Sequence, residues 1–168
     1  HLSRTVEDVN LSFADFKATI NNVMMANVGN FCYRTLSFAA RNYPKGISHI
    51  ANGKEEKDLV KKCTTLVGEI ENLYYEQDIK NALKKILQIS DLGNSYFQKL
   101  EPWRKRDVAE EQTMVDAKVA FCINLTRNIS ILLKPILPEF SRHIEKSLGV
   151  EDIVGKKGYG LQWRDMSY

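Results

Sequence analysis

Apolar residues recur along most of this chain at spacings of three, four and seven residues, which is the period of an amphipathic helix. Ser12 followed by Asp15 resembles a helix N-cap with an acidic first turn. The helix that begins there is expected to end before Pro44, because the residue before a proline avoids the α conformation. Its apolar face comprises Phe13, Phe16, Ile20, Val23, Met24, Phe31 and Phe38.

Four further segments show the same helical period. A second helix is expected from near Lys54. A third is expected to begin around residues 76–78, where the polarity shifts, and to end at Pro102. Asp107 is the expected cap of a fourth helix, and a fifth is expected to start at Pro138, because proline is favoured in a first helical turn.

Gly149 is the expected C′ residue of the fifth helix, and no segment predicts a strand. Short loops between helices make neighbours antiparallel, so the fold class predicted is all-α, an antiparallel helical bundle of about five helices. The bundle is expected to occupy residues 1–150. Residues 151–168 are rich in glycine, lysine and aromatic residues without a period, and they predict an irregular C-terminal tail that packs on the bundle or on something outside this chain.

Composition supports a single globular domain of 168 residues, with 43% hydrophobic and 27% charged residues. No uncharged apolar run approaches the roughly 18 residues of a membrane span, so no membrane partner is expected. The three cysteines, Cys32, Cys63 and Cys122, show no zinc-site spacing and predict buried, reduced thiols of a cytoplasmic protein. The first residue is His1 rather than Met, which indicates a piece of a longer protein or the remnant of a tag.

Sequence signatures of catalysis are absent from this chain. It has neither a GxSxG nucleophile elbow nor a GxxxxGK[ST] phosphate loop, and its carboxylates alternate with lysines as on a solvated helix face. We therefore expect binding rather than catalysis, with no catalytic residue, metal or cofactor in this chain.

Two local features favour RNA as the ligand. Asn30 and Arg34 lie four residues apart on one helix face, where an amide and a guanidinium can together hydrogen-bond a base edge; Asn27 extends this strip by nearly a turn. The alternative is that these side chains bond buried backbone groups or cap a neighbouring helix.

The second feature is the junction Pro102-Trp103, which the cations Arg104, Lys105 and Arg106 follow. Exposed aromatic rings stack on unpaired bases, and basic side chains attract phosphates. The alternative is a buried tryptophan with the three cations solvating the loop, and composition alone does not separate the two.

Three segments together resemble methionyl-tRNA synthetases. The stretch 27–35 is similar to that family's N-x-G-N-x-x-x-R-T sequence, 93–103 to its G-N-x-Y-x-x-x-x-x-P-W junction, and 132–138 to its L-x-P-x-x-P pattern. Their order and separation also agree, so the resemblance covers most of the chain. It implies the helical anticodon-binding domain of a class I aminoacyl-tRNA synthetase, whose ligand is the CAU anticodon stem-loop of methionine tRNA.

The resemblance also implies roles for individual residues. Trp103 would stack on the first anticodon base, Asn30 and Arg34 would read the cytosine edge, and Pro102 would fix the approach of the ring. Residues 104–106 would contact the RNA backbone. Ala26 stands where many members carry a further asparagine, so no reading of the second base is carried over.

The family's ATP-site signatures, His-x-Gly-His and Lys-Met-Ser-Lys-Ser, are missing. ATP and the charging reaction would therefore belong to a catalytic domain elsewhere in the same parent chain, a methionine–tRNA ligase, on which the tail could also pack. Two other functions remain open. One is the anticodon module of another class I synthetase, and the other is a helical protein-interaction scaffold, which would bury Trp103 and offer an apolar groove.

Overall fold

The computed structural model describes residues 20–47, 49–150 and 163–166, and over these residues every regular element is a helix. This confirms the predicted all-α bundle. Its five long α-helices are α2 (Asn30–Asn42), α3 (Lys54–Tyr75), α4 (Ile79–Leu100), α6 (Gln112–Leu133) and α7 (Pro138–Ser147). The shorter elements are the π-helix η1 (Ile20–Gly29), the single turn α5 (Pro102–Lys105) and the 3-10 turn η3 (Trp163–Asp165).

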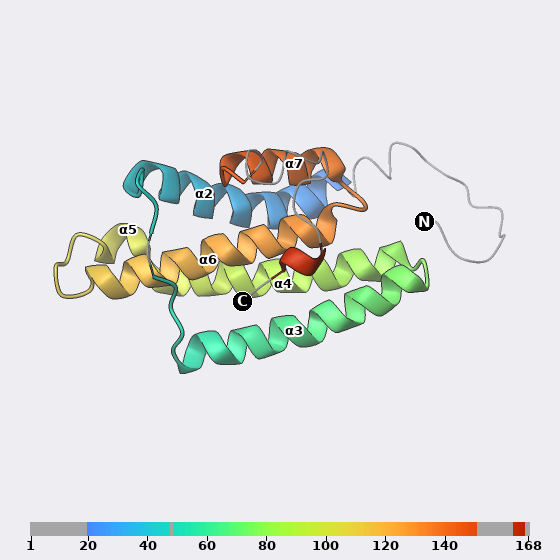
Figure 1. The fold of residues 1–168 in the computed structure, drawn as a ribbon, viewed down its shortest axis with the longest axis horizontal. Coiled ribbons are helices and arrows are strands. Elements are labelled where there is room, and N and C mark those ends of the chain that lie inside the picture. The colour runs from blue at the N-terminus through green and yellow to red at the C-terminus, as the bar shows by residue number, and fades with distance from the viewer. Residues whose placement is uncertain (1–19, 48, 151–162, 167–168) are drawn as a thin grey trace.

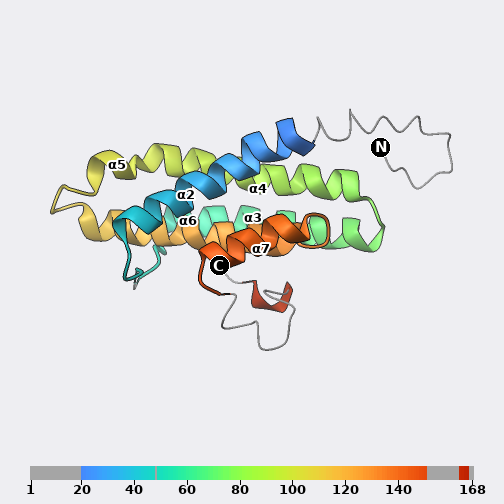
Figure 2. The same cartoon turned by 90° about the horizontal axis from the view of Figure 1, so that it is seen from above.

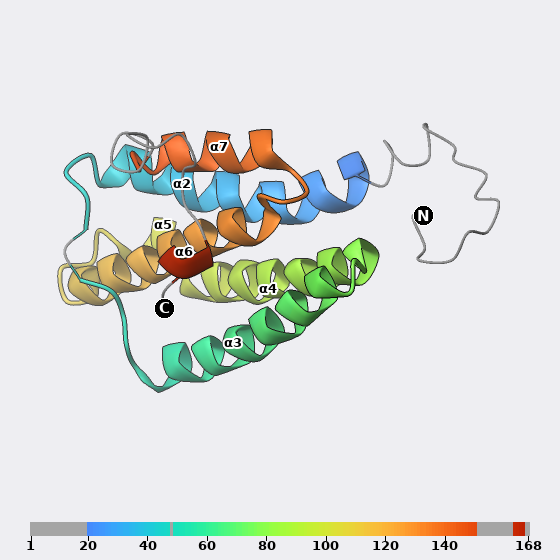
Figure 3. The same ribbon diagram turned by 45° about the vertical axis from the view of Figure 1, so that its right-hand side comes forward.

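The helices form three layers. Helices α4 and α6 lie in the middle, α3 covers one side of them, and α2 and α7 cover the other (Figures 1 and 3). Seen from above, α2 runs obliquely across the middle layer, and α5 lies at the end of the bundle where α4 ends (Figure 2). Residues of α2 are thereby brought beside the last turns of α4.

A main core fills the space between these layers, and a smaller cluster of Leu100, Val115 and Val119 lies beside it. Fully buried apolar side chains come from every long helix but α7, and each contributes about 1.5–3 kcal/mol through removal of apolar surface from water. The largest are Phe31, Phe97, Ile70, Ile86, Ile89, Leu125, Ile129, Leu132 and Leu133. Phe31 and Phe97 have a second effect besides this burial, because they fix α2 against the C-terminal half of α4.

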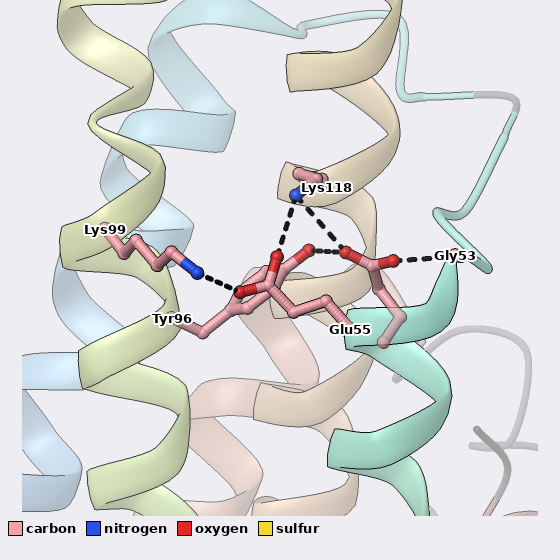
Figure 4. Close-up of polar contacts among 6 residues, drawn as sticks. Gly53, Glu55, Tyr96, Lys99 and Lys118 are labelled. Atoms are coloured by element: carbon pink, nitrogen blue, oxygen red, sulfur yellow. Dashed lines mark hydrogen bonds and ion pairs between the residues drawn. The ribbon is translucent and has the colours of Figure 1, made fainter.

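A polar cluster holds the C-terminal end of α4 to α3 and α6 (Figure 4). The hydroxyl of Tyr96 on α4 donates to the buried carboxylate of Glu56 on α3, which also accepts from the backbone N–H of Gly53 at 2.9 Å. Lys118 of α6 lies 3.1 Å from Glu55 and 3.5 Å from Glu56. Buried charged groups are tolerated only when they are paired in this way, so the cluster fixes the three helices in register.

Several predicted helix boundaries are confirmed. The second and fifth helices begin as expected at Lys54 and at Pro138, and the third begins after Asp78, at the end of the segment predicted for its start. The carboxylate of Asp78 accepts from the backbone N–H of Asn81 at 3.1 Å, which makes it a true N-cap. Gly149 has a φ of +67° and follows the last helical residues, as a C′ glycine does.

The first helix differs from the prediction of one continuous α-helix. Its described part is a π-helix from Ile20 to Gly29, followed by α2. The buried residues of the π-helical part, Met24 and Val28, are four apart, a spacing that suits both kinds of helix, so the apolar pattern could not separate them. The expected cap at Ser12 and Asp15 lies outside the described residues.

The fourth helix also differs from its prediction. Asp107 does not cap it, since α6 begins only at Gln112, and Pro102 does not simply end a helix but opens the separate turn α5. Val108, the apolar residue that follows Asp107, is exposed in the connection between α5 and α6.

Most of the predicted tail, residues 151–162 and 167–168, lies outside the described residues. Trp163 packs edge-on against Tyr74 of α3 at 6.4 Å between ring centroids, and Arg127 of α6 donates to the backbone oxygen of Asp165. Residues 163–166 thus lie on the bundle, and a domain boundary at residue 150 stays a prediction.

Candidate nucleic-acid interface

The junction between α4 and α5 is built around a left-handed residue. Glu101 has a φ of +47°, an uncommon conformation for a residue with a side chain, and the chain turns sharply there. Pro102 follows at the first position of α5, where a missing N–H is not needed, and it is buried. The turn carries Trp103 away from the axis of α4 and back over its last residues.

Trp103 is 43% exposed, so the interpretation of this residue as a buried plug is wrong. One side of its ring rests on Phe97, with 6.1 Å between the ring centroids. The guanidinium carbon of Arg34 lies 5.5 Å from the Trp103 centroid and 5.6 Å from that of Phe97. At such distances the cation is attracted by the negative faces of both rings.

Arg34 is held from a third direction by Gln98 of α4, whose side-chain oxygen accepts from Nη2 at 2.7 Å. The guanidinium is planar and carries five N–H donors in a fixed fork. Two ring contacts and one hydrogen bond therefore fix its orientation, while other donors stay available to a ligand.

A cleft of about 480 Å³ opens beside Arg34 and Trp103, between α2 and α5, and we call it the Trp103 cleft. Its floor contains the aromatic side chain of Phe97, and its walls are mainly polar. The lining residues are Arg34, Ser37, Phe38, Arg41, Asn42, Phe97, Pro102, Trp103, Arg106 and Asp107.

Four of the predicted site residues thus meet in one place: Arg34, Pro102, Trp103 and Arg106. Asn30 is exposed one helical turn before Arg34, on the same face of α2, with no hydrogen bond from its side chain to any residue that the structure describes. Its amide is therefore available next to the Trp103 cleft.

Asn27 is placed differently from the prediction that it extends the exposed polar strip. Its side-chain amide donates to Asp91 of α4 at 2.6 Å, and its backbone oxygen accepts from Asn94 at 3.4 Å. These bonds tie η1 to α4. A ligand could use this amide only by opening the bond to Asp91.

The three cations after Trp103 are not equivalent. Arg104 pairs with Glu101 at 3.1 Å and does not line the cleft. Arg106 lies 5.6 Å from the ring centroid of Tyr43, lies 3.4 Å from the carboxylate of Asp107, and donates to the backbone oxygen of Asn42 at 3.4 Å. Lys105 is half-buried beside them.

Tyr43 supports Arg106 from below. Its hydroxyl donates to the carboxylate of Asp116 on α6 at 2.7 Å. Burial raises the pKa of this phenol well above its usual range, and the negative charge of Asp116 raises it further. The ring therefore stays neutral and presents a flat, uncharged support for the guanidinium.

As site residues, six of the ten that line the cleft were missed by sequence reasoning: Ser37, Phe38, Arg41, Asn42, Phe97 and Asp107. Ser37 and Arg41 follow Arg34 at three and seven residues, which is the same face of α2 over two turns, so extending the Asn30 and Arg34 spacing would have found them. Phe97 lies in the core, and its ring also supports Trp103.

The arrangement suits an unstacked base. A half-exposed indole offers a face for stacking, and the amide and guanidinium beside it can hydrogen-bond the edge of the same base. Within the described ranges no group of His, Cys, Asp and Glu could hold a metal ion. The described helices also include none that is long and apolar enough to cross a membrane.

Comparison with known proteins agrees with this interpretation. Residues 44–159, more than half of the chain, match the family model described as the anticodon binding domain of methionyl tRNA ligase. This match includes the Trp103 junction, whereas Asn30 and Arg34 precede it. The chain is 33% identical over 165 residues to the methionine–tRNA ligase of Methanopyrus kandleri, covering 98% of this chain and 23% of that protein.

The methionine–tRNA ligase of Pyrococcus furiosus is 32% identical over 148 residues, covering 87% of this chain and 20% of that protein. The chain thus spans about a quarter of the length of these relatives or less. In fold it is similar to the Mycobacterium tuberculosis methionyl-tRNA synthetase in complex with methionyl-adenylate, with a TM-score of 0.72 and 20% identity, over 90% of this chain and 31% of that one. The chain belongs to the family of anticodon-binding domains of methionyl tRNA ligases.

Proposed function

We propose that this domain recognises the CAU anticodon of methionine tRNA through the Trp103 cleft. The observation that supports this most directly is the pairing of Trp103, half-exposed, with a guanidinium that three side chains orient. A protein-interaction scaffold needs no such pairing of a stacking surface with oriented donors.

In this proposal Trp103 stacks on the first anticodon base, once that base has left the loop's own stack. Asn30 and Arg34 read the edge of the cytosine, which presents one amino donor beside a ring nitrogen and a carbonyl acceptor. Arg34 supplies donors for the two acceptors, and the amide oxygen of Asn30 can accept from the amino group. Pro102 fixes the approach of the ring.

Preorganisation favours this discrimination. Arg34 is already held by Phe97, Trp103 and Gln98, so little side-chain freedom is lost when a base binds. A purine or uracil would leave a donor or acceptor of the site without its partner, which costs about 1–3 kcal/mol when the site is closed to water. Of the three cations expected near the RNA backbone, Arg104 is paired with Glu101, so Lys105 and Arg106 carry that part of the proposal. Asn27 is a weaker candidate because of its bond to Asp91.

The whole protein, we propose, is a cytoplasmic methionine–tRNA ligase that charges methionine tRNA at the expense of ATP. The support is the identity of the relatives and the methionyl-adenylate bound in one structure of similar fold. ATP would bind to a catalytic domain of the same parent chain, and the present domain, residues 1–150 with the tail 151–168, would need no cofactor of its own.

The test is binding of a fluorescent anticodon stem-loop with CAU to the 168-residue chain, against a loop in which only the first base is changed, at two salt concentrations. We expect CAU to bind at least about tenfold more tightly, and this ratio to survive at the higher salt, because base contacts release few counterions. Equal binding of both loops, lost together as salt rises, would contradict the proposal and favour the scaffold.

A further inference from the structure

Arg41 is the arginine of the Trp103 cleft that has no partner among the residues that the structure describes. It lines the cleft near the end of α2 and is exposed, and its side chain makes no ion pair or hydrogen bond with any residue that the structure describes. The sequence did not single it out, because it lies apart from the cluster of cations that follows Trp103.

The other three arginines near the Trp103 cleft have partners. Arg34 is bonded to Gln98 and stacked on two rings, Arg104 is paired with Glu101, and Arg106 is bonded to Asn42 and Asp107. A phosphate that approaches Arg104 must compete with a carboxylate at 3.1 Å, whereas Arg41 forms no ion pair in the described part of the chain. The carboxylate that lines the same cleft, Asp107, pairs with Arg106.

The position of Arg41 relative to Arg34 also suits a nucleotide. The two lie seven residues apart on one face of α2, which is about 10.5 Å along the helix axis, with Ser37 between them. A base that stacks on Trp103 beside Arg34 carries its sugar and phosphate outward, and the cleft continues from Arg34 past Ser37 to Arg41. A cation at that end faces the only charged part of the nucleotide.

We propose that Arg41 binds the backbone phosphate of the nucleotide whose base stacks on Trp103, and that Arg104 does not bind the RNA backbone. This inference rests on the proposed function. It assigns the phosphate of the stacked nucleotide to the end of α2 and removes Arg104 from the cations expected near the RNA backbone. Sequence and base recognition stay with Asn30, Arg34 and Trp103, since a phosphate contact carries no sequence information.

A purely structural role for Arg41 must be separated from this one. Arg41 lies in the last turn of α2, where a cation stabilises the helix through the macrodipole. That role would lower the melting temperature when the charge is removed, but it would leave the salt dependence of RNA binding unchanged.

The experiment measures binding of the two anticodon stem-loops, CAU and the one altered at its first base, to the 168-residue chain at four salt concentrations. Arg41→Gln is compared with Arg104→Gln, a matched removal of one arginine charge at the same end of the bundle, and with Arg41→Lys. Melting temperatures of all four proteins are recorded alongside.

Arg41→Gln is expected to weaken binding of both loops by the same factor, roughly fivefold to tenfold at low salt, and to reduce the slope of log affinity against log salt by about 0.7. Arg41→Lys keeps a point charge and is expected to keep that slope. Arg104→Gln is expected to change neither affinity nor slope measurably.

Three results would overturn the inference. Arg104→Gln could reduce the slope while Arg41→Gln does not, or Arg41→Gln could weaken binding with an unchanged slope, as a helix-stabilising residue would. In both cases the unaltered chain would still prefer CAU, so the proposed function would stand. If the unaltered chain binds both loops equally, the proposed function fails, and the assignment of Arg41 to a stacked nucleotide fails with it.

Discussion

The ring of Phe31 on α2 lies directly over Gly93 of α4. A Cβ atom at position 93 would be only 2.6 Å from the Cζ atom of that ring, closer than carbon atoms pack in proteins. The missing side chain at this point lets α2 approach α4, and Phe31 immediately follows Asn30 in the chain. The distance between the two helices at this contact therefore helps to set where Asn30 and Arg34 stand relative to Phe97 and Gln98.

Gly93→Ala is expected to destabilise the domain, although alanine is the better helix former. Overpacking a core position costs about 1–3 kcal/mol, which exceeds the gain of about 1 kcal/mol from helix propensity. Chemical denaturation should show a net loss of up to about 2 kcal/mol, and CAU stem-loop affinity should fall because α2 is pushed away from α4.

Gly68→Ala is the matched control, because Gly68 lies within α3 and a Cβ there would meet nothing within 4 Å. It should stabilise the domain by about 0.5–1 kcal/mol and leave RNA binding unchanged. If both alanine variants were stabilised equally, the Phe31 contact would not be restricting the approach of α2 to α4.

Trp103→Ala is expected to weaken CAU binding by about 1–3 kcal/mol, the contribution of one stacked base, without loss of the helical circular-dichroism signal. The ring is half-exposed, so its removal leaves most of the core in place. Titration with the fluorescent stem-loop measures the first effect, and thermal melting by circular dichroism measures the second.

Trp163→Ala provides the comparison for that variant. Trp163 packs on Tyr74 in the last turn of α3, at the opposite end of the bundle from α5, and should affect stability but not RNA affinity. A Trp103→Ala protein that has lost its helical signal would show that the ring is structural, and the role assigned to it would be wrong.

The sequence predicted those helices whose ends are set by local chemistry. Pro138 lacks the N–H that a first helical turn leaves unpaired, Gly149 takes the left-handed φ of a C′ residue, and both were predicted in these roles. The third helix was expected to begin around residues 76–78, and it begins after Asp78, whose carboxylate caps it. The start of α6 at Gln112 was missed, because no side chain caps it and the Asp107 carboxylate pairs with Arg106 instead.

Those site residues that lie on a single helix face or at a single junction could be predicted from the sequence. Arg34 and Trp103 were found in this way, through spacing and through the Pro-Trp junction. The hydrogen-bond and ion-pair partners of individual polar side chains could not be predicted, because they depend on how closely the helices pack. Examples are Gln98 for Arg34, Asp91 for Asn27 and Glu101 for Arg104.

The three cysteines are expected to be unreactive in the folded domain. Cys32, Cys63 and Cys122 are all buried and free, as predicted. Burial raises the pKa of Cys32 to about 12 and that of Cys63 to about 11, and it raises that of Cys122 further, so almost no thiolate is present near neutral pH. A thiol reagent at pH 7.5 should modify none of them until denaturant is added; rapid labelling of one cysteine without denaturant would show that its surroundings open locally.

Tyr96→Phe should destabilise the domain by about 1–3 kcal/mol, because it leaves the buried carboxylate of Glu56 without its hydroxyl donor. Urea denaturation at pH 7 measures this loss. Tyr75→Phe removes a hydroxyl from an exposed tyrosine and should change the free energy of unfolding by no more than about 0.5 kcal/mol.

The same carboxylate predicts an acid dependence of stability. Burial of Glu56 opposes its ionisation, but the hydrogen bonds from Tyr96 and the backbone and the charge of Lys118 together hold its pKa below the usual 4.5. A lowered pKa in the folded state means that the ionised carboxylate stabilises the fold above pH 4.5, and that this contribution is lost as the pH falls through the lowered pKa. Glu56→Gln should therefore flatten the fall in unfolding free energy as the pH drops below 4.5, leaving the part that comes from Glu55, whose pKa Lys99 and Lys118 also lower. An equally steep fall in the Glu56→Gln protein would show that other carboxylates cause the acid sensitivity and that the cluster at the end of α4 is held by packing alone.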